Sequence, residues 1–150
     1  MRCIVQRVKN AKVVVDNEVV GAIDKGIMVL VGMGKEDNEK TFEYIAGKLI
    51  NLRIFTDEND KMNLSVADIG GGVLVVPNFT LYGDARQGRR PSYIAGAEPS
   101  VAADIFKNFM EYMKKAYDGK VESGIFQAHM EVELINNGPV TLLIDSDKLF

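Results

Sequence analysis

The sequence has little of the chemistry on which the commonest catalytic sites depend. It contains one histidine and one cysteine in 150 residues. A Ser-His-Asp or Cys-His site needs a histidine base, and His129 is the single residue that could serve. His129 alternates with Glu131 and Glu133, which favours an exposed position on a strand over a metal site formed by the three side chains. Cys3 lies at the start of an apolar strand and is expected in the core.

Other absences exclude whole classes of protein. A single cysteine rules out a disulfide within the chain, which suits a reducing compartment. No apolar run approaches the roughly 18 residues needed to span a bilayer, and the first residues lack the features of a signal peptide. The glycines at 32–34 and 70–72 do not have the spacing of a phosphate loop or a dinucleotide fingerprint, so turns explain them better. We therefore predict a cytoplasmic protein without a metal or a cofactor and without a membrane partner.

What is present describes an ordinary globular domain with one local concentration of positive charge. Hydrophobic residues make up 47% of the chain and charged residues 26%, and the length suits one domain over residues 1–150. The formal net charge of −3 argues against a protein that coats nucleic acid, and DNA is not an expected partner. Arg86, Arg89 and Arg90 nevertheless fall close together, which suits contact with RNA at a single basic spot.

The spacing of apolar residues predicts a strand-rich chain with two helices. Residues 1–33 show short strands separated by turn signals, which is typical of antiparallel hairpins. A first helix, capped by Asp37 or Asn38, extends to about Leu52, and Pro99 opens a second helix that ends near Gly119. Residues 128–134 alternate as a strand, which residues 136–139 break and residues 140–144 resume. The pattern predicts a mixed α/β fold of mostly antiparallel β-sheets packed on one another, with two helices on one side.

Two segments do not look like generic scaffold. Residues 76–84 (VPNFTLYGD) place polar and hydroxyl groups at the end of a buried strand, just before the arginines. A hydroxyl that bonds the local backbone is the simpler explanation of Thr80. Residues 136–141 (NNGPVT) contain a proline that must lie at an edge, a bulge or a turn, and the glycine before it leaves both carbonyls accessible. A hairpin turn is the simpler explanation of this second segment.

Together these segments resemble the D-aminoacyl-tRNA deacylase family of bacteria and eukaryotes. The family usually has Ser-Gln where Pro77 and Asn78 stand, and glycine where Gln127 stands. A related branch with relaxed chiral selectivity also has proline at position 77, but it differs at Phe79 and around the Gly-Pro pair. The resemblance runs the whole length of the chain and includes, in order, residues 1–8, 52–55, 61–65, 79–84, 88–92 and 137–141.

The resemblance implies a barrel-like packing of the sheets and an enzyme that hydrolyses the ester of D-aminoacyl-tRNA, a chiral proofreading step in translation. Glycyl-tRNA mischarged on tRNA-Ala is an expected second substrate. It also implies a homodimer in which the cis dipeptide Gly138-Pro139 of one subunit enters the site of the other and is held in place by Arg7. The two carbonyls would bond the amino group of a D-amino acid, whereas an L side chain would collide with backbone.

The site residues implied by the resemblance fall into three groups. With no histidine base available, the 2′-hydroxyl of the terminal adenosine is the expected acid/base group, and backbone N–H groups around Phe79 and Thr80 would hold the oxyanion. A positioning hydroxyl is favoured over a nucleophile for Thr80, because no activating base is visible. The groups are Phe79 and Thr80 as catalytic residues; Arg7, Asn78, Ala128, Met130, Gly138 and Pro139 for the substrate; and Arg86, Arg89 and Arg90 for tRNA.

Two alternatives stay open on the sequence. Pro77 and Gln127 are compatible with a relaxed-chirality deacylase of the same family that acts on mischarged L-aminoacyl-tRNA. From a different class, the chain could be a binding module for the tRNA 3′ end without catalysis. Hydrolysis of matched D-, L- and glycyl-tRNA would separate the three.

Overall fold

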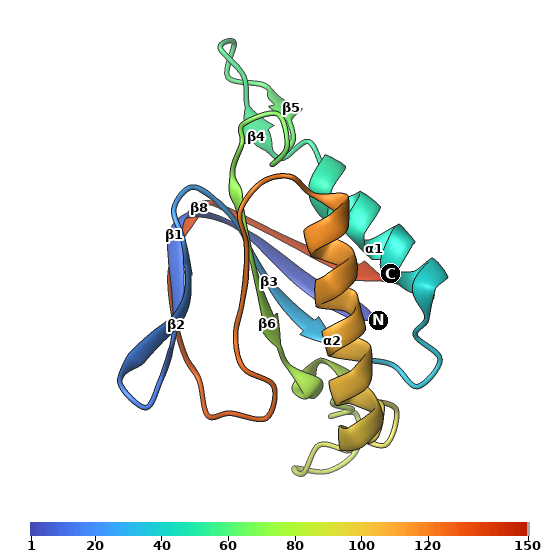
Figure 1. The fold of residues 1–150 in the computed structure, drawn as a ribbon. Helices are drawn as coiled ribbons and strands as arrows, with labels where there is room; N and C mark the ends of the chain where they lie inside the picture. The colour runs from blue at the N-terminus through green and yellow to red at the C-terminus, as the bar shows by residue number, and fades with distance from the viewer. Residues whose placement is uncertain (150) are drawn as a thin grey trace.

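One long strand organises the fold. The computed structural model describes residues 1–149, in which β1 (Arg2–Val15) pairs antiparallel with three other strands (Figure 1). Along one edge of β1 lie β3 (Gly26–Gly32) and β2 (Glu18–Ile23), which pair with its first and second halves. Because each strand has only two edges, β8 (Glu131–Asp145) takes the other edge, and it follows β1 over nearly its full length. The antiparallel pairing predicted for residues 1–33 is confirmed for β1 with β2, but β2 and β3 do not form a second hairpin with each other, because both pair with β1.

The hairpin between β1 and β2 has the expected turn chemistry. Asp16 and Asn17 have φ angles of 50° and 66°. Positive φ at both central residues defines a type I′ turn, whose twist matches that of the flanking strands.

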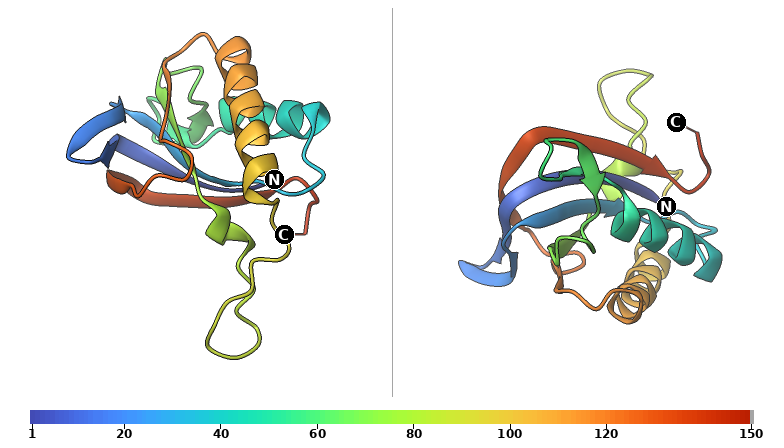
Figure 2. Two further views of the ribbon diagram at one scale, coloured as in Figure 1. Left: turned by 60° about the horizontal axis from the view of Figure 1, so that its bottom comes forward. Right: turned by 90° about the horizontal axis from the view of Figure 1, so that it is seen from above.

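The centre of the sheet is parallel. β6 (Gly72–Pro77) lies parallel to β3, and β7 (Val121–Ser123) lies parallel to β6. Both connections are crossovers that carry a helix, and both helices cover the same face of the sheet (Figures 1 and 2). The far end of β2 returns to β7, where a Cβ on Gly21 would lie 2.6 Å from the carbonyl oxygen of Ser123. The sheet is therefore nearly closed, and the predicted mixed fold, barrel-like with two helices on one side, is confirmed.

The two helices begin where the sequence indicates. α1 (Glu39–Asn51) is capped by Asn38, whose Oδ1 accepts the Lys40 N–H at 3.0 Å, while the Asn38 N–H is 3.3 Å from Thr41 Oγ1. This capping box decides between the two predicted caps. α2 (Pro99–Ala116) starts at its proline and ends three residues before Gly119. A short ribbon of β4 (Phe55–Thr56) and β5 (Met62–Leu64) lies beyond α1 (Figure 1). No helix within residues 1–149 is long and apolar enough to cross a membrane.

Apolar side chains fill both faces of the central strands. The larger cluster lies under the helices and joins α1 and α2 to β3 and β6 through residues such as Leu49, Phe109 and Val29. The smaller cluster lies on the opposite face and includes Val13, Met28 and Leu74. Burial on both faces explains why β3 and β6 are continuous apolar runs. Cys3 is 1% exposed, as expected of a core residue, and burial raises the pKa of its thiol to about 12.

β8 departs from prediction at two places. It runs unbroken through residues 136–139, and the expected break is instead an irregularity at which its register on β1 shifts between Gln6 and Val8. The Gly138-Pro139 bond is cis, as the resemblance implied. A bulge accommodates the extra residues without ending the strand. His129 was expected on this strand beside Glu131, but β8 begins only at Glu131, so His129 belongs to the exposed segment before it.

Candidate active site

A cavity of about 1100 Å³ opens where β6 ends. Leu30 of β3 and three segments line it: residues 76–80 at the end of β6, residues between 93 and 102 that lead into α2, and residues between 126 and 132 that lead into β8. Its floor is apolar and includes Val76, Ala102 and Met130, whereas Glu98 and His129 contribute polar groups. An apolar cavity with few polar groups is the usual form of a small-molecule or cofactor site.

Asn78 shapes the turn at the edge of this cavity. Its N–H donates to the Val31 carbonyl at 2.7 Å, which extends the pairing of β6 with β3 by one residue. Its side-chain Oδ1 accepts both the Thr80 N–H, at 3.1 Å, and the Thr80 hydroxyl. These bonds start the 3₁₀ turn η1 (Phe79–Tyr82), in which the Gly83 N–H donates to the Thr80 carbonyl at 2.9 Å. The predicted Asn-Phe-Thr segment therefore forms a capped turn at the cavity edge.

The backbone N–H groups of Phe79 and Thr80 are not equally available to a substrate. The Thr80 N–H is occupied by Asn78, so it does not serve as a free donor for an oxyanion. The first N–H of a helical turn has no partner within the turn, which makes that of Phe79 the better donor. The Thr80 hydroxyl donates to an amide oxygen, which is not a base that could activate it.

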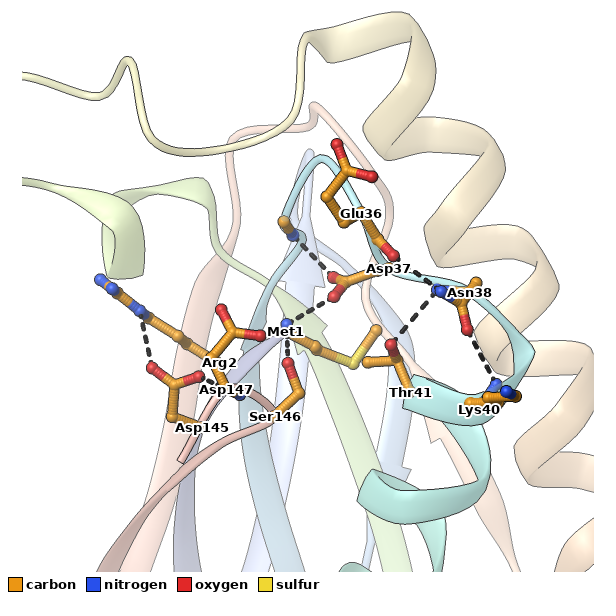
Figure 3. Close-up of polar contacts among 11 residues, drawn as sticks. Met1, Arg2, Glu36, Asp37, Asn38, Lys40, Thr41, Asp145, Ser146 and Asp147 are labelled. Atoms are coloured by element: carbon orange, nitrogen blue, oxygen red, sulfur yellow. Dashed lines mark hydrogen bonds and ion pairs between the residues drawn. The ribbon is translucent and has the colours of Figure 1, made fainter. Parts of the chain in front are cut away.

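A partly buried polar cluster at the start of the chain, drawn in Figure 3, contacts η1 through Arg2. Arg2 donates from Nη1 to the Leu81 carbonyl at 3.3 Å, and its Nε lies 3.2 Å from Asp145 Oδ2. The Arg2 guanidinium also lies 4.5 Å from the centre of the Tyr82 ring. The Met1 amino group donates to Asp37 Oδ1 at 2.5 Å, and burial raises the pKa of this carboxyl. The start of β1 thus fixes the turn that borders the cavity.

Aromatic and basic side chains continue outward from the turn. Phe79 is 61% exposed and its ring meets that of Tyr93 edge to face, with centroids 5.2 Å apart. Beyond η1 the chain forms a hairpin closed by paired hydrogen bonds of 2.7 and 2.9 Å between the backbones of Asp84 and Ser92. All three predicted tRNA-binding arginines lie on this exposed hairpin.

Gly138 and Pro139 lie elsewhere on the molecule. Arg7 donates from Nε to the Asn137 carbonyl at 3.1 Å and from Nη1 to the Ile54 carbonyl at 2.5 Å, so it contacts the segment as the resemblance implied. Arg7 is opposite Ile27 on β3, which pairs with Val73 near the start of β6. The cavity lies at the other end of β6, and neither residue of the dipeptide belongs to its lining. The predicted site residues therefore form two separate groups within one chain.

The chain resembles known proteins over nearly its whole length. The model of the D-Tyr-tRNA(Tyr) deacylase family matches residues 4–145. Relatives called D-aminoacyl-tRNA deacylase include those of Thermosipho africanus, 56% identical, and Koribacter versatilis, 52% identical, each over the whole of both chains.

The chain belongs to the D-Tyr-tRNA(Tyr) deacylase family.

Solved structures give the same fold. The c-Myc DNA Unwinding Element Binding Protein superposes with a TM-score of 0.91 at 36% identity, over 97% of this chain and 98% of that one. A probable eukaryotic D-amino acid tRNA deacylase superposes with a TM-score of 0.82 at 19% identity, over 95% and 97% of the two chains, which supports the fold alone. The family resemblance read from the sequence is confirmed.

Within this family fold, the cavity brings together five of the predicted site residues: Asn78, Phe79, Thr80, Ala128 and Met130. The cavity also has a polar rim formed by Glu98, Gln127 and His129, none of which the sequence prediction places among the site residues, although it connects Gln127 with specificity. Glu98 directly precedes the predicted helix-opening Pro99, and His129 stands between two predicted site residues, so both carried a usable signal. Within residues 1–149, no group of three or more His, Cys, Asp or Glu side chains is placed to hold a metal ion.

Proposed function

We propose that this protein hydrolyses the ester between a D-amino acid and the 3′ end of tRNA. The observation that carries the proposal is the capped Asn78-Phe79-Thr80 turn at the edge of an apolar cavity in a member of a deacylase family. The relatives named above are deacylases, and this chain matches them over their full length. Hydrolysis of the aminoacyl ester is therefore the reaction that this turn serves.

The chemistry relies on backbone and substrate. Water attacks the ester carbonyl, and the Phe79 N–H stabilises the oxyanion that forms. The neighbouring 2′-hydroxyl of the terminal ribose relays a proton to the departing 3′ oxygen, which leaves a free amino acid and tRNA. Asn78 and Thr80 hold the turn and the substrate in place, and no covalent acyl-enzyme forms.

A second copy of the chain supplies the chiral selection. Gly138 and Pro139 lie too far along the sheet to line the cavity of their own chain, which supports action across a homodimer. Gly138 has a φ of 125°, and a Cβ there would lie 2.8 Å from the Val140 nitrogen and 3.0 Å from Arg7 Nη2. The dipeptide thus presents backbone carbonyls, which bond the amino group of a D substrate and exclude an L side chain.

Exclusion of this kind has a consequence for glycine. Glycine has a hydrogen in place of a side chain, so the site has nothing to exclude. To reject glycyl-tRNA, the site would need a contact that only a substrate with a side chain makes. Glycyl-tRNA is therefore a substrate, including glycine mischarged on tRNA-Ala. The cytoplasm is the location we propose, because a role in translation quality control would be carried out there.

A direct test follows ester loss from matched D-alanyl-, L-alanyl- and glycyl-tRNA. We expect rapid loss of the D and glycyl esters and persistence of the L ester. Equal loss of all three would replace the proposal by a relaxed-chirality deacylase. Binding of all three without hydrolysis would replace it by a binding module for the tRNA end.

A further inference from the structure

The three arginines of the hairpin of residues 84–92 differ in their ion pairing. We propose that Arg89 and Arg90 at its tip bind phosphates of the RNA strand that leads to the esterified nucleotide. Arg86 instead pairs with Asp84, which stabilises the hairpin, and binds no phosphate. This inference rests on the proposed function, because it names how that same substrate is held outside the cavity.

The base of the hairpin is fixed to the catalytic turn. The Gly83 N–H bonds the Thr80 carbonyl at 2.9 Å, and the paired backbone bonds between Asp84 and Ser92 follow immediately. Tyr93, the next residue, packs its ring against Phe79. From this base the hairpin projects away from the body of the protein in both views of Figure 2. A strand held at its tip is therefore held at a defined place relative to the cavity edge.

The Arg86 guanidinium pairs with Asp84 within the hairpin. Its Nε donates to Asp84 Oδ1 at 2.8 Å and its Nη2 to Asp84 Oδ2 at 2.7 Å. The backbone N–H of Arg86 also donates to Asp84 Oδ1, at 3.0 Å. These bonds hold the pKa of the Asp84 carboxyl well below its usual range. A bidentate pair of this kind leaves little net charge for a phosphate and orders the first half of the hairpin.

Arg89 and Arg90 remain available at the tip. Both side chains are exposed, and neither forms an ion pair in the part of the chain that the structure describes. Gly88 precedes them with a φ of 68°, the left-handed conformation that turns the chain at the tip. The whole chain carries a net charge of −3, so the body repels a polyanion while the tip attracts it. This contrast orients the RNA with its backbone on the hairpin.

The length of the hairpin matches a short stretch of RNA. Gly88 is four residues beyond Asp84 in the sequence, so the tip lies at most about 13–14 Å from the base of the hairpin. A stacked nucleic-acid strand advances roughly 3.4 Å per nucleotide, so the tip reaches phosphates about four steps before the esterified nucleotide. That stretch is the single-stranded 3′ end of a tRNA.

Salt dependence distinguishes a phosphate contact from a structural one. Binding of uncharged tRNA is measured from roughly 50 to 200 mM salt for the wild type, the double variant Arg89→Ala/Arg90→Ala and Arg86→Ala. We expect the double variant to reduce the magnitude of the slope of log K against log salt by about 1.4, since each contact to a single strand contributes about 0.7. Arg86→Ala weakens binding but keeps the wild-type slope. Lys114→Ala/Lys115→Ala, which removes the same charge from the end of α2, is the matched control and keeps the slope.

A truncated substrate completes the test. D-tyrosyl-adenosine carries the ester but no preceding phosphates. In the double arginine variant, the ratio of kcat/KM for D-tyrosyl-tRNA to that for D-tyrosyl-adenosine should fall about tenfold, which equals roughly 1.4 kcal/mol. An unchanged slope or an unchanged ratio in the double variant would overturn the inference, and so would a loss of slope of about 0.7 in Arg86→Ala, the value for one phosphate contact. If the wild type hydrolyses neither ester, the proposed function fails, while the salt slopes still decide the role of the hairpin.

Discussion

At the scale of single residues, the candidate site depends on which polar atoms already have hydrogen-bond partners within the protein. Asn78 occupies both the N–H and the hydroxyl of Thr80, which leaves that side chain as part of a cap rather than as a nucleophile. Because the Thr80 N–H already donates to Asn78, the proposed oxyanion role is assigned to the Phe79 N–H. A catalytic assignment made from residue types alone could not separate these two neighbours.

Replacing Thr80 by alanine tests the positioning role. We expect the rate of D-tyrosyl-tRNA hydrolysis to fall by the equivalent of one lost hydrogen bond, roughly 0.5–1.5 kcal/mol in transition-state stabilisation. Single-turnover kinetics measure this loss, and Thr80→Ser, which keeps the hydroxyl, is the control. A loss of several orders of magnitude, or an acyl group trapped on Thr80, would show that the nucleophile assignment is correct.

Gln127 is a residue in an unfavourable conformation at the cavity. Its φ is 64°, the left-handed region that glycine adopts freely and glutamine does not. Gln127→Gly should therefore raise the free energy of unfolding by about 0.5–1 kcal/mol, once the greater flexibility of unfolded glycine is counted. Urea denaturation measures the change. Asn tolerates this region better than most residues, so Gln127→Asn should fall between the two, and a destabilised Gln127→Gly variant would contradict the argument.

The sequence could predict residues whose signal is local. Asn78, Phe79 and Thr80 follow a continuous apolar strand, so their place at a strand end is readable from the pattern. The left-handed conformation of Gln127 and the pairing of Arg86 with Asp84 depend on the final course of the backbone. Neither follows from residue type, which is why all three arginines carry the same role in the sequence prediction.

At the scale of elements, local periodicity predicts most strands and both helices, and the turn signals predict antiparallel pairing near the N-terminus, but neither predicts the parallel pairs at the centre of the sheet. β3 and β6 are both continuous apolar runs, and their parallel pairing depends on the α1 crossover between them. The turn signal at residues 136–139 predicts a break in the strand, which the structure does not have. β1 continues past this point and keeps β8 paired on both sides of the irregularity, so tertiary pairing overrides the local signal.

The turn between β4 and β5 gives a pH-dependent contribution to stability. Hydrogen bonds from the backbone N–H of Lys61, the side chain of Asn63 and the backbone N–H of Asn59 lower the pKa of Asp57. Because the pKa is lower in the folded protein, the stabilisation is present above the unfolded value and is lost as pH falls through the folded value.

Asp57→Asn should remove this contribution. The variant keeps an acceptor for the two backbone N–H groups, but it has no charge and places an amide against Asn63. We expect its Tm to lie below that of the wild type at pH 6, and the gap should narrow as the pH falls below the usual Asp value of 3.8. Thermal denaturation from pH 6 to the acid limit measures the gap. A gap that stays constant with pH would exclude the charge as its cause.

At the scale of the whole molecule, the two groups of predicted site residues lie at opposite ends of the sheet. Asn78, Phe79 and Thr80 border the cavity at the end of β6, whereas Arg7 bonds the Asn137 carbonyl, next to the dipeptide, near the level of its start. The nearly closed sheet fixes the distance between them. Within one chain only the first group lines the cavity, so the proposed use of both groups at one substrate requires a second copy.

Mixing two inactive variants tests this arrangement. Gly138→Ala strains a backbone at a φ of 125° and should abolish chiral capture, while Ala128→Trp should fill the cavity and block the substrate. Each variant alone forms dimers without a working site. In a mixed dimer, the intact cavity of the Gly138→Ala chain meets the intact dipeptide of the Ala128→Trp chain, so one of the two sites works. Random exchange of subunits should restore on the order of a quarter of the wild-type D-tyrosyl-tRNA hydrolysis. Because each chain in a mixture carries one defect, no restoration in mixtures shown to exchange subunits would mean that the cavity and the dipeptide act within the same chain.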